Sequence, residues 1–177
     1  MEKRLLSEEE KIKYSAEILE MMRISDKDFV PPLSSRTSTT QSNLSGEGAG
    51  GIELYFSEMI KQKVLGAFEG DKLFGIVSFK ENYETEIVKE LPNIYISTLF
   101  LHPDSRGRGV TKQLYSYLFF ELYKNCNVFT RTWSTNLAHI KILDFFGFEL
   151  FHRIENDRGD GIDTVYFKRM AEEKYGK

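Results

Sequence analysis

A helical repeat of apolar residues opens the chain. The apolar positions on one helical face are Tyr14, Ile18, Met21 and Met22. Ser7 followed by Glu10 has the spacing of a capping box, in which each side chain binds the other residue's backbone N–H. Together these patterns predict a helix over residues 7–23.

The following stretch has no periodicity. Residues 33–51 are rich in Ser, Thr and Gly, and roughly 20 residues without a pattern make a long loop for a compact domain. Two interpretations of this loop, at about 31–52, stay open: a flexible surface connector, or a lid on the substrate side of a site. Within it, Arg36 is a candidate to bind a substrate carboxylate, because a guanidinium pairs with a carboxylate through parallel hydrogen bonds.

The rest of the chain alternates strand and helix patterns. An apolar run at 94–101 is typical of a strand covered on both faces. The other expected elements are a helix at about 53–62, a hairpin of strands 64–69 and 72–80 turning at Gly70-Asp71, an acidic connector at 81–92, an amphipathic helix from 110 to about 122, a strand at 128–133, a helix from 135 or 136 to about 146, and a final hairpin of strands 148–154 and 164–169. This order predicts a mixed α/β fold with one central sheet, in which the strands at 94–101 and 128–133 run parallel.

The bulk composition narrows the class of protein. A chain of 177 residues with 41% apolar and 14% aromatic residues fits one domain, residues 1–177, with a real core. The net charge of −3 and the absence of a long Lys or Arg run argue against nucleic-acid binding. Cys126 is the only cysteine, which excludes an internal disulfide and a Cys-rich metal site. With no apolar stretch near the roughly 20 residues that span a bilayer, and no signal-type start, we expect a cytoplasmic protein without membrane contact.

The segment after the strand at 94–101 is the strongest chemical signal. It carries the turn R-G-R-G at 106–109 and then begins a helix. A helix start offers unpaired N–H groups and the positive end of the helix dipole, and Gly107 and Gly109 let the backbone approach an anion closely. An ordinary turn with solvated arginines is the competing interpretation. The G-x-G-x-x-G pattern is absent, since position 112 is Lys, and the P-loop pattern G-x-x-x-x-G-K-[ST] is absent as well.

Two segments resemble the GCN5-related N-acetyltransferase (GNAT) superfamily. L-F-L-H-P-D-S-R-G-R-G-V-T-K-Q-L is similar to its acetyl-CoA-binding segment, which reads here as Arg106, Gly107, Arg108, Gly109, Val110 and Thr111, with Thr111 in place of the usual small residue. T-N-L-A-H-I-K-I-L-D-F-F-G-F-E is similar to a later family segment in which an Asn precedes a short helix that ends in Gly-Phe. The matching residues there are Asn136, Gly147 and Phe148. The resemblance covers about residues 64–169.

The resemblance implies a GNAT-like fold with splayed parallel strands and a site for acetyl-CoA between them. It implies that backbone groups of Leu99 and Leu101 pair with the pantetheine arm like an added strand. The N–H groups from Arg106 to Thr111 would hold the diphosphate, and Asn136 would bind the arm near its thiol end. A backbone N–H around Phe100 or Leu101 would stabilise charge that develops on the thioester oxygen.

Proton transfer is where the chain departs from the family. The family often places a Tyr four residues before the Gly of Gly-Phe, and here that position is Leu143. Tyr166 is a candidate to replace it, although a thiol pKa of about 8.5 makes the thiolate a tolerable leaving group without a dedicated acid. The acceptor amine also needs a base. Candidates are Glu81, Glu84, Glu86, His102, His139 and His152, of which Glu81 is preferred. The competing interpretation of each is an ordinary solvated or packed residue.

The acceptor side has few readable signals. The last hairpin borders the acceptor site in the family, and its turn holds Glu155, Asp157, Asp160 and Asp163. These carboxylates either form a rim that attracts a cationic amine or merely shape the turn. Trp133 is expected in the core or in a site wall.

These observations predict an N-acetyltransferase that moves an acetyl group from acetyl-CoA to a primary amine by direct attack in a ternary complex. We expect a small-molecule acceptor and no metal, and the aromatic content permits a homodimer. The absent tyrosine at Leu143 motivates one alternative, a non-catalytic acyl-CoA-binding or regulatory domain. A protein N-terminal or lysine acetyltransferase is the other.

Overall fold

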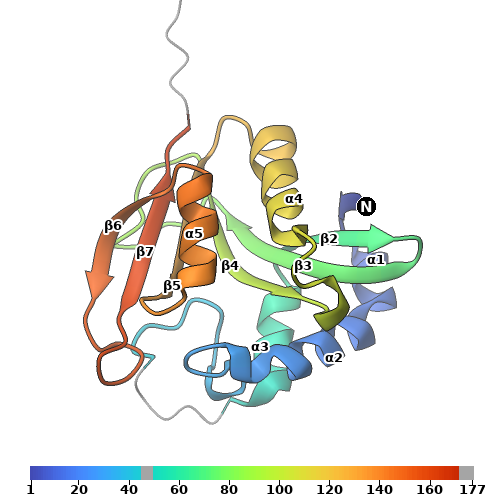
Figure 1. Cartoon of the computed structure of the whole chain (residues 1–177), viewed down its shortest axis with the longest axis horizontal. Coiled ribbons are helices and arrows are strands. Elements are labelled where there is room, and N and C mark those ends of the chain that lie inside the picture. The colour runs from blue at the N-terminus through green and yellow to red at the C-terminus, as the bar shows by residue number, and fades with distance from the viewer. Residues whose placement is uncertain (45–49, 172–177) are drawn as a thin grey trace, which may run out of the picture.

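The computed structural model describes residues 1–44 and 50–171, and it contains one sheet of seven strands. In spatial order these are β1 (Glu2–Leu5), β2 (Lys63–Glu69), β3 (Lys72–Glu81), β4 (Asn93–Leu101), β5 (Asn127–Trp133), β7 (Thr164–Arg169) and β6 (Glu149–Ile154). The helices are α1 (Glu8–Lys13), α2 (Ser15–Ser25), α3 (Gly51–Ile60), α4 (Val110–Tyr117), which continues into the π-helical segment η4 (Leu118–Leu122), and α5 (Leu137–Phe145). The predicted mixed α/β fold with one central sheet is confirmed (Figure 1).

The central strands β4 and β5 form the parallel pair that the sequence predicts. They pair from Asn93 opposite Asn127 to Ile96 opposite Thr130. Both strands continue beyond that point, yet no register joins them there in the described residues. The Thr130 hydroxyl donates to the Ile96 carbonyl at 3.1 Å and so closes the ladder where the strands separate. The middle of the sheet therefore opens into a wedge.

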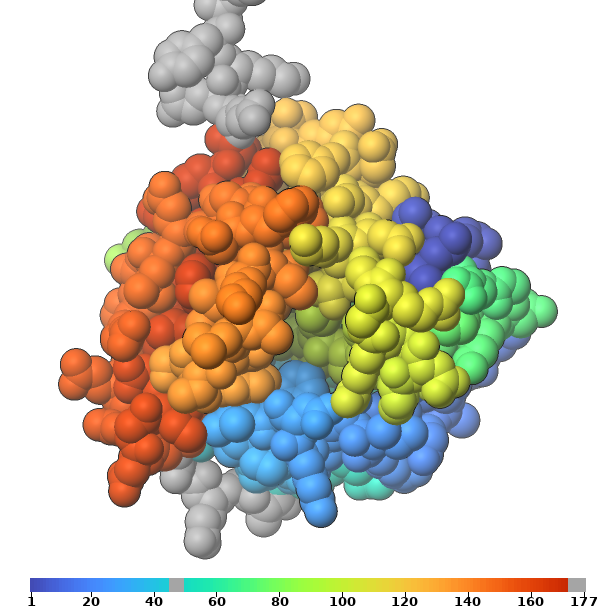
Figure 2. All heavy atoms as spheres, in the orientation of Figure 1, coloured from blue at the N-terminus to red at the C-terminus, as the bar shows by residue number. Residues whose placement is uncertain are grey.

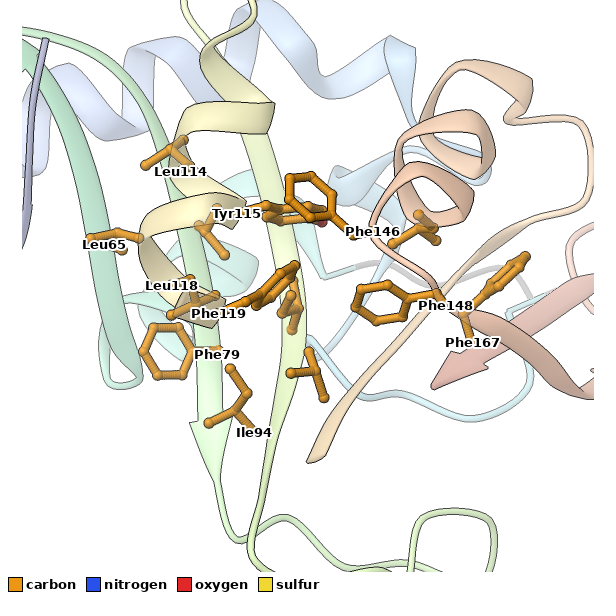
Figure 3. Close-up of a cluster of buried hydrophobic side chains, with 14 of the residues drawn as sticks. Leu65, Phe79, Ile94, Leu114, Tyr115, Leu118, Phe119, Phe146, Phe148 and Phe167 are labelled. Atoms are coloured by element: carbon orange, nitrogen blue, oxygen red, sulfur yellow. The ribbon is translucent and has the colours of Figure 1, made fainter. Parts of the chain in front are cut away.

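Helices cover both faces of the sheet. In Figure 1, α4 and α5 lie in front of the sheet with β4 visible between them, and α2 and α3 lie toward the lower side. One buried cluster joins the sheet to α4, η4 and the end of α5, and Figure 3 shows rings of Tyr115, Phe119, Phe146 and Phe148 meeting within it. A second cluster packs α2, α3 and the residues Leu6 and Tyr14, which lie on either side of α1, against β2, β3 and Phe100 of β4. The sheet is thus covered by two separate cores, of which the first reaches both sides of the wedge.

The amino-terminal region differs from its prediction in two ways. The capping box is confirmed, with Ser7 N–H donating to Glu10 Oε2 at 3.0 Å and Glu10 N–H donating to Ser7 Oγ at 3.2 Å. The expected single helix is divided into α1 and α2 at Tyr14, whose buried ring packs on Phe68. The strand β1 was missed, because its sequence E-K-R-L has no apolar alternation and its pairing with β2 is a long-range contact.

The long segment after α2 is packed as far as the structure describes it. Leu33 and Leu44 are fully buried, and Arg36 and Thr39 are buried polar residues. Residues 45–49 of the expected loop lie outside the described residues. Within the described ranges, no helix is both long and apolar enough to cross a membrane.

Candidate active site

A cavity of about 280 Å³ occupies the wedge between β4 and β5. Its walls come from β4 between Ile96 and Leu101, from β5 between Thr130 and Trp133, from the start of α5, and from the segment that follows α2. Figure 2 shows the corresponding hollow between the surfaces of α4 and α5, closed on its lower side by the segment after α2. The cavity therefore passes between the separated strands and meets groups from both faces of the sheet.

The glycine turn before α4 leaves its backbone open to a ligand. Gly107 and Gly109 have φ values of 73° and 72°, which residues with a Cβ rarely adopt. Gly109 is the N-cap of α4 and has no side chain to cap the helix. The first N–H of this helix with an acceptor four residues back is that of Gln113, which bonds to the Gly109 carbonyl at 3.1 Å. The N–H groups of Arg106 and Arg108 are already used, since they donate to the Pro103 and Ser105 carbonyls at 3.2 and 3.3 Å, so the candidates for a ligand are those of Gly107 and of residues 109–112.

The arginines of this turn are held beside it rather than over it. Arg106 pairs with Asp28 at 2.6 Å, and Arg108 pairs with Glu69 at 2.5 Å. Both pairs are exposed, and exposed ion pairs contribute only about 0–1 kcal/mol each. The arginines can therefore be released at small cost when an anion reaches the turn. Arg106 and Thr111 line the cavity, which places the helix start at its edge.

A bulge in β4 shapes the other wall. Ser78 of β3 pairs with Thr98 and its neighbour Phe79 pairs with Ile96, so Ser97 is the extra residue. The Ser97 hydroxyl donates to Gln62 Oε1 at 2.6 Å. From this bulge onward, the edge of β4 that faces β5 has no strand partner among the described residues. Leu99, Phe100 and Leu101 all line the cavity along this edge.

Asn136 faces the same cavity from the start of α5. Its Oδ1 accepts from the His139 N–H at 3.3 Å and so caps the helix, as the sequence predicts for this position. Its Nδ2 donates to Thr132 Oγ1 at 2.9 Å. The cap fixes the orientation of the amide, and the structure brings Asn136 together with the β4 residues and the helix start named by the resemblance.

The two preferred proton-transfer residues do not line the cavity. Glu81 is exposed at the far end of β3 and accepts from the Tyr123 hydroxyl at 2.6 Å. Tyr166 is buried on β7, and its hydroxyl accepts from Arg131 Nη1 at 3.2 Å. Tyr166 is therefore one residue removed from the cavity, through Arg131. The side-chain partner of Glu81, Tyr123, does not line the cavity. Leu143, in the usual tyrosine position, is fully buried in the core.

Of the remaining proton-transfer candidates, His139 lines the cavity and the others do not. His102 accepts from the Asp104 N–H at 3.2 Å and belongs to the turn, while His152 is exposed beside Tyr166. Glu84 and Glu86 are exposed and lie outside the cavity lining. His139 is the histidine that lines the cavity, and its Nε2 is 2.8 Å from the Tyr115 hydroxyl.

Acid is expected to destabilise the fold through His139. Burial lowers the pKa of His139 to about 4, whereas an unfolded chain binds that proton near 6.5. Between these values the unfolded state binds more protons than the folded state. His139 therefore does not reduce the free energy of unfolding above about pH 6.5, and it reduces this free energy by up to about 3 kcal/mol as the pH drops toward 4. Urea denaturation across this range, compared with His139→Gln, measures the effect.

The variant His139→Gln should lose that part of the acid dependence, because glutamine does not titrate. Replacing the exposed His152 by Gln is the matched control and should leave the acid limb of the wild type in place. An acid limb of equal steepness in His139→Gln and in the wild type would show that this histidine is not the responsible group.

Sequence reasoning missed two arginines of the site. Arg131 of β5 and Arg158 of the β6–β7 turn line the cavity together with the predicted Arg36. A signal for Arg131 exists, because it is a charged residue in the middle of the otherwise apolar and hydroxyl-bearing strand V-F-T-R-T-W. Trp133 lines the cavity as a site wall, in agreement with its prediction.

The acidic turn residues do not form a rim on the cavity. Asp163 accepts from Arg153 at 2.8 Å and from the Asn156 N–H at 3.0 Å, and Asp157 accepts from Thr164 Oγ1. The interpretation as turn-shaping residues is therefore the correct one, and Arg158 is the residue of this turn that reaches the cavity. In the part of the chain that is described, no three His, Cys, Asp or Glu side chains gather in a way that would hold a metal ion.

Comparisons with known proteins agree with this geometry. A structure of yncA, a putative acetyltransferase from Salmonella typhimurium with its cofactor acetyl-CoA, has a TM-score of 0.65 at 15% identity and covers 100% of this chain and 97% of that chain. An aminoglycoside 6'-N-acetyltransferase complexed with coenzyme A has a TM-score of 0.68 at 11% identity, with 99% and 100% coverage. A ribosomal-protein-alanine N-acetyltransferase from Brucella melitensis has a TM-score of 0.65 at 14% identity, with 96% and 99% coverage.

At these identities the likeness shows a shared fold. No curated protein gives a significant sequence match. The family model for acetyltransferases of the GNAT type matches residues 20–148, a range that includes the glycine turn, the wedge and Asn136. The protein therefore belongs to the acetyltransferase (GNAT) family, whose members use acetyl-CoA as co-substrate.

Proposed function

We propose that this chain transfers the acetyl group of acetyl-CoA to a primary amine of a small molecule by direct attack in a ternary complex. The observation that supports it is the meeting, in one cavity, of an unpaired strand edge and an uncapped helix start. The strand edge is complementary to the amides of a pantetheine arm, and the helix start is complementary to a diphosphate.

The residues present fit this co-substrate. Of the expected N–H groups from Arg106 to Thr111, those of Gly107 and of residues 109–111 would hold the diphosphate, because the Arg106 and Arg108 N–H groups donate to carbonyls of the preceding turn. Gly107 and Gly109 leave room for its oxygens. The Thr111 side chain lines the cavity, so its hydroxyl is available as a further donor to a phosphate oxygen. Backbone groups of Leu99 and Leu101 would pair with the arm, and Asn136 Nδ2 would exchange its bond with Thr132 for one with the arm near its thiol end.

Catalysis in this proposal depends on positioning and on electrostatic stabilisation. Phe100 and Leu101 both line the cavity, and a backbone N–H around them would stabilise the charge that develops on the thioester oxygen. Holding amine and thioester in contact replaces a bimolecular encounter. Tyr166 remains a candidate proton donor only through water, because it does not line the cavity, and Glu81 would need a longer chain of waters still.

The test is release of coenzyme A thiol when purified protein is given acetyl-CoA and a panel of amines, with the acetylated product identified by mass spectrometry. A reaction without amine corrects for hydrolysis of the thioester. We expect amine-dependent thiol release with at least one member of the panel. Tight acetyl-CoA binding by calorimetry with no release across a broad panel would instead support the non-catalytic alternative that the buried Leu143 motivates.

A further inference from the structure

Three arginines from separate parts of the chain converge on the cavity. Arg36 comes from the segment after α2, Arg131 from β5 and Arg158 from the β6–β7 turn, and all three line the cavity. Arg36 and Arg158 are each only 6% exposed. Burial, together with the charges of the other two arginines, lowers the pKa of Arg158 to about 9. Three guanidinium charges thus share one poorly solvated wall.

None of the three has a carboxylate partner within residues 1–44 and 50–171. Their hydrogen bonds go to neutral groups instead. Arg36 Nη2 donates to the Pro31 carbonyl at 2.7 Å, Arg158 Nη1 donates to the Val30 carbonyl at 2.6 Å, and Arg131 Nη2 donates to the Gln41 carbonyl. By contrast, five other arginines of the described residues pair with acidic side chains, namely Arg4, Arg23, Arg108, Arg153 and Arg106, the last at the cofactor end of the cavity.

The nearby carboxylates are already engaged. Asp157 accepts from the Leu44 N–H at 3.2 Å and from the Thr164 hydroxyl, and Asp26 accepts from the Ser34 N–H at 2.8 Å. Asp28, which among the described residues is the one acidic member of the cavity lining, pairs with Arg106 at the cofactor end. The cavity wall is therefore strongly positive in a chain whose net charge is −3.

Anchoring of the segment at 30–41 explains the hydrogen bonds of these arginines but not their charge. A neutral amide side chain can donate to the same carbonyls, whereas a buried charge without a paired counter-ion costs several kcal/mol. The charge of Asp157 offsets part of this cost for Arg131 and Arg158 without pairing with either. A ligand anion in the cavity would remove that cost, and a guanidinium fork matches the planar geometry of a carboxylate. Phe29 and Trp133, whose ring centroids are 5.9 Å apart, supply an apolar wall beside these arginines.

We propose that the acceptor is an amine that also carries a carboxylate, as free amino acids do, and that Arg36, Arg131 and Arg158 bind this carboxylate. The inference rests on the proposed acetyl transfer and specifies its substrate class. This acceptor takes the place of the cationic amine that an acidic rim would have favoured. Arg36 then binds a substrate carboxylate, as its residue type suggests in the sequence. The arginines orient the acceptor, so that its amine faces the cavity between β4 and β5.

The first experiment compares each amino acid with its decarboxylated counterpart in the wild-type protein: phenylalanine with phenethylamine, leucine with isoamylamine, and methionine with 3-(methylthio)propylamine. Phosphoethanolamine tests whether a phosphate replaces the carboxylate, and spermidine tests a cationic acceptor. We expect kcat/KM for at least one amino acid to exceed that of its amine by about tenfold or more, the range for hydrogen bonds to charged groups. Equal or better acetylation of the decarboxylated amines, of spermidine or of phosphoethanolamine would overturn the proposal.

The second experiment uses variants of the arginines. Arg131→Gln and Arg158→Gln should raise KM for the amino acid by about 10- to 100-fold and leave kcat/KM for its decarboxylated amine within about threefold. Arg131→Lys keeps the charge but not the planar guanidinium fork, so its KM for the amino acid should lie between those of the wild type and Arg131→Gln. Arg23→Gln, at an exposed ion pair on α2, is the matched control and should behave as wild type. Equal losses for both acceptors would mean that the arginines only support the fold.

A binding measurement separates the two proposals. Calorimetry on protein saturated with coenzyme A, titrated with the same amino acid and amine pairs, needs no turnover. Binding of an amino acid but not of its amine supports the anion site even if no acetyl transfer is found, in which case the proposed function alone fails. Transfer to amines with no preference for the carboxylate leaves the function standing and removes this inference.

Discussion

Gly107→Glu is expected to abolish acetyl-CoA binding, weakening it by at least about 100-fold. The residue has a φ of 73°, so any side chain there strains the backbone by about 1–2 kcal/mol. A carboxylate at this turn would also meet the diphosphate, and two like charges 4 Å apart near a protein surface repel by about 4 kcal/mol. Either charge or bulk would exclude the phosphates from the N–H groups that begin α4.

Isothermal titration with acetyl-CoA measures this loss, and circular dichroism checks that the variant is folded. Gly107→Ala is the matched control, because a Cβ at this position meets no atom within 4 Å. The alanine variant keeps the backbone strain without the charge and should bind only several-fold more weakly than wild type. Wild-type affinity in a folded Gly107→Glu protein would show that the diphosphate does not lie at this turn.

Phe119→Ala is expected to lower the free energy of unfolding by about 3–5 kcal/mol, the usual cost of removing a buried aromatic ring. Phe119 is fully buried in η4, and its ring centroid lies 5.4 Å from that of Phe146 and 5.5 Å from that of Phe148. It therefore joins the α4 side of the wedge to the α5 side, as Figure 3 shows. Loss of this ring should loosen the cavity walls as well as the core.

Urea denaturation followed by circular dichroism measures the effect, and the neighbouring Phe120→Ala is the control. Phe120 is 46% exposed, so its removal should cost less than about 1 kcal/mol. Similar losses in the two variants would contradict the burial that the structure assigns to these adjacent rings. A loss confined to Phe119 would confirm that the two sides of the wedge depend on one core.

The cofactor side of the site was predictable because its determinants are local. The apolar strand, the R-G-R-G turn and the amphipathic helix follow one another in the chain, and each has a short-range physical signature. Gly107 and Gly109 adopt the left-handed conformation for which glycine is suited, and Asn136 caps α5 where its residue type predicts a cap. The parallel pairing of the flanking strands follows from their connection through a helix.

The acceptor side was not predictable because long-range packing assembles it. Arg36, Arg131 and Arg158 are widely separated in sequence, and only the fold brings them to one wall. Arg158 lies in a turn rich in acidic residues, so the sequence predicts an acidic surface there, whereas Asp163 is bonded within the turn. The strand β1 escaped prediction for a similar reason, since its pairing with β2 spans most of the first third of the chain.

In our proposal, the backbone N–H groups before and at the start of α4 bind the diphosphate of acetyl-CoA, and its arm lies between β4 and β5. A crystal structure of the protein with coenzyme A tests it most directly. We predict phosphate oxygens at about 2.7–3.2 Å from amide nitrogens between Gly107 and Thr111, and a pantetheine arm along Leu99 to Leu101. Coenzyme A bound at another surface, with this turn and the wedge empty, would contradict the account.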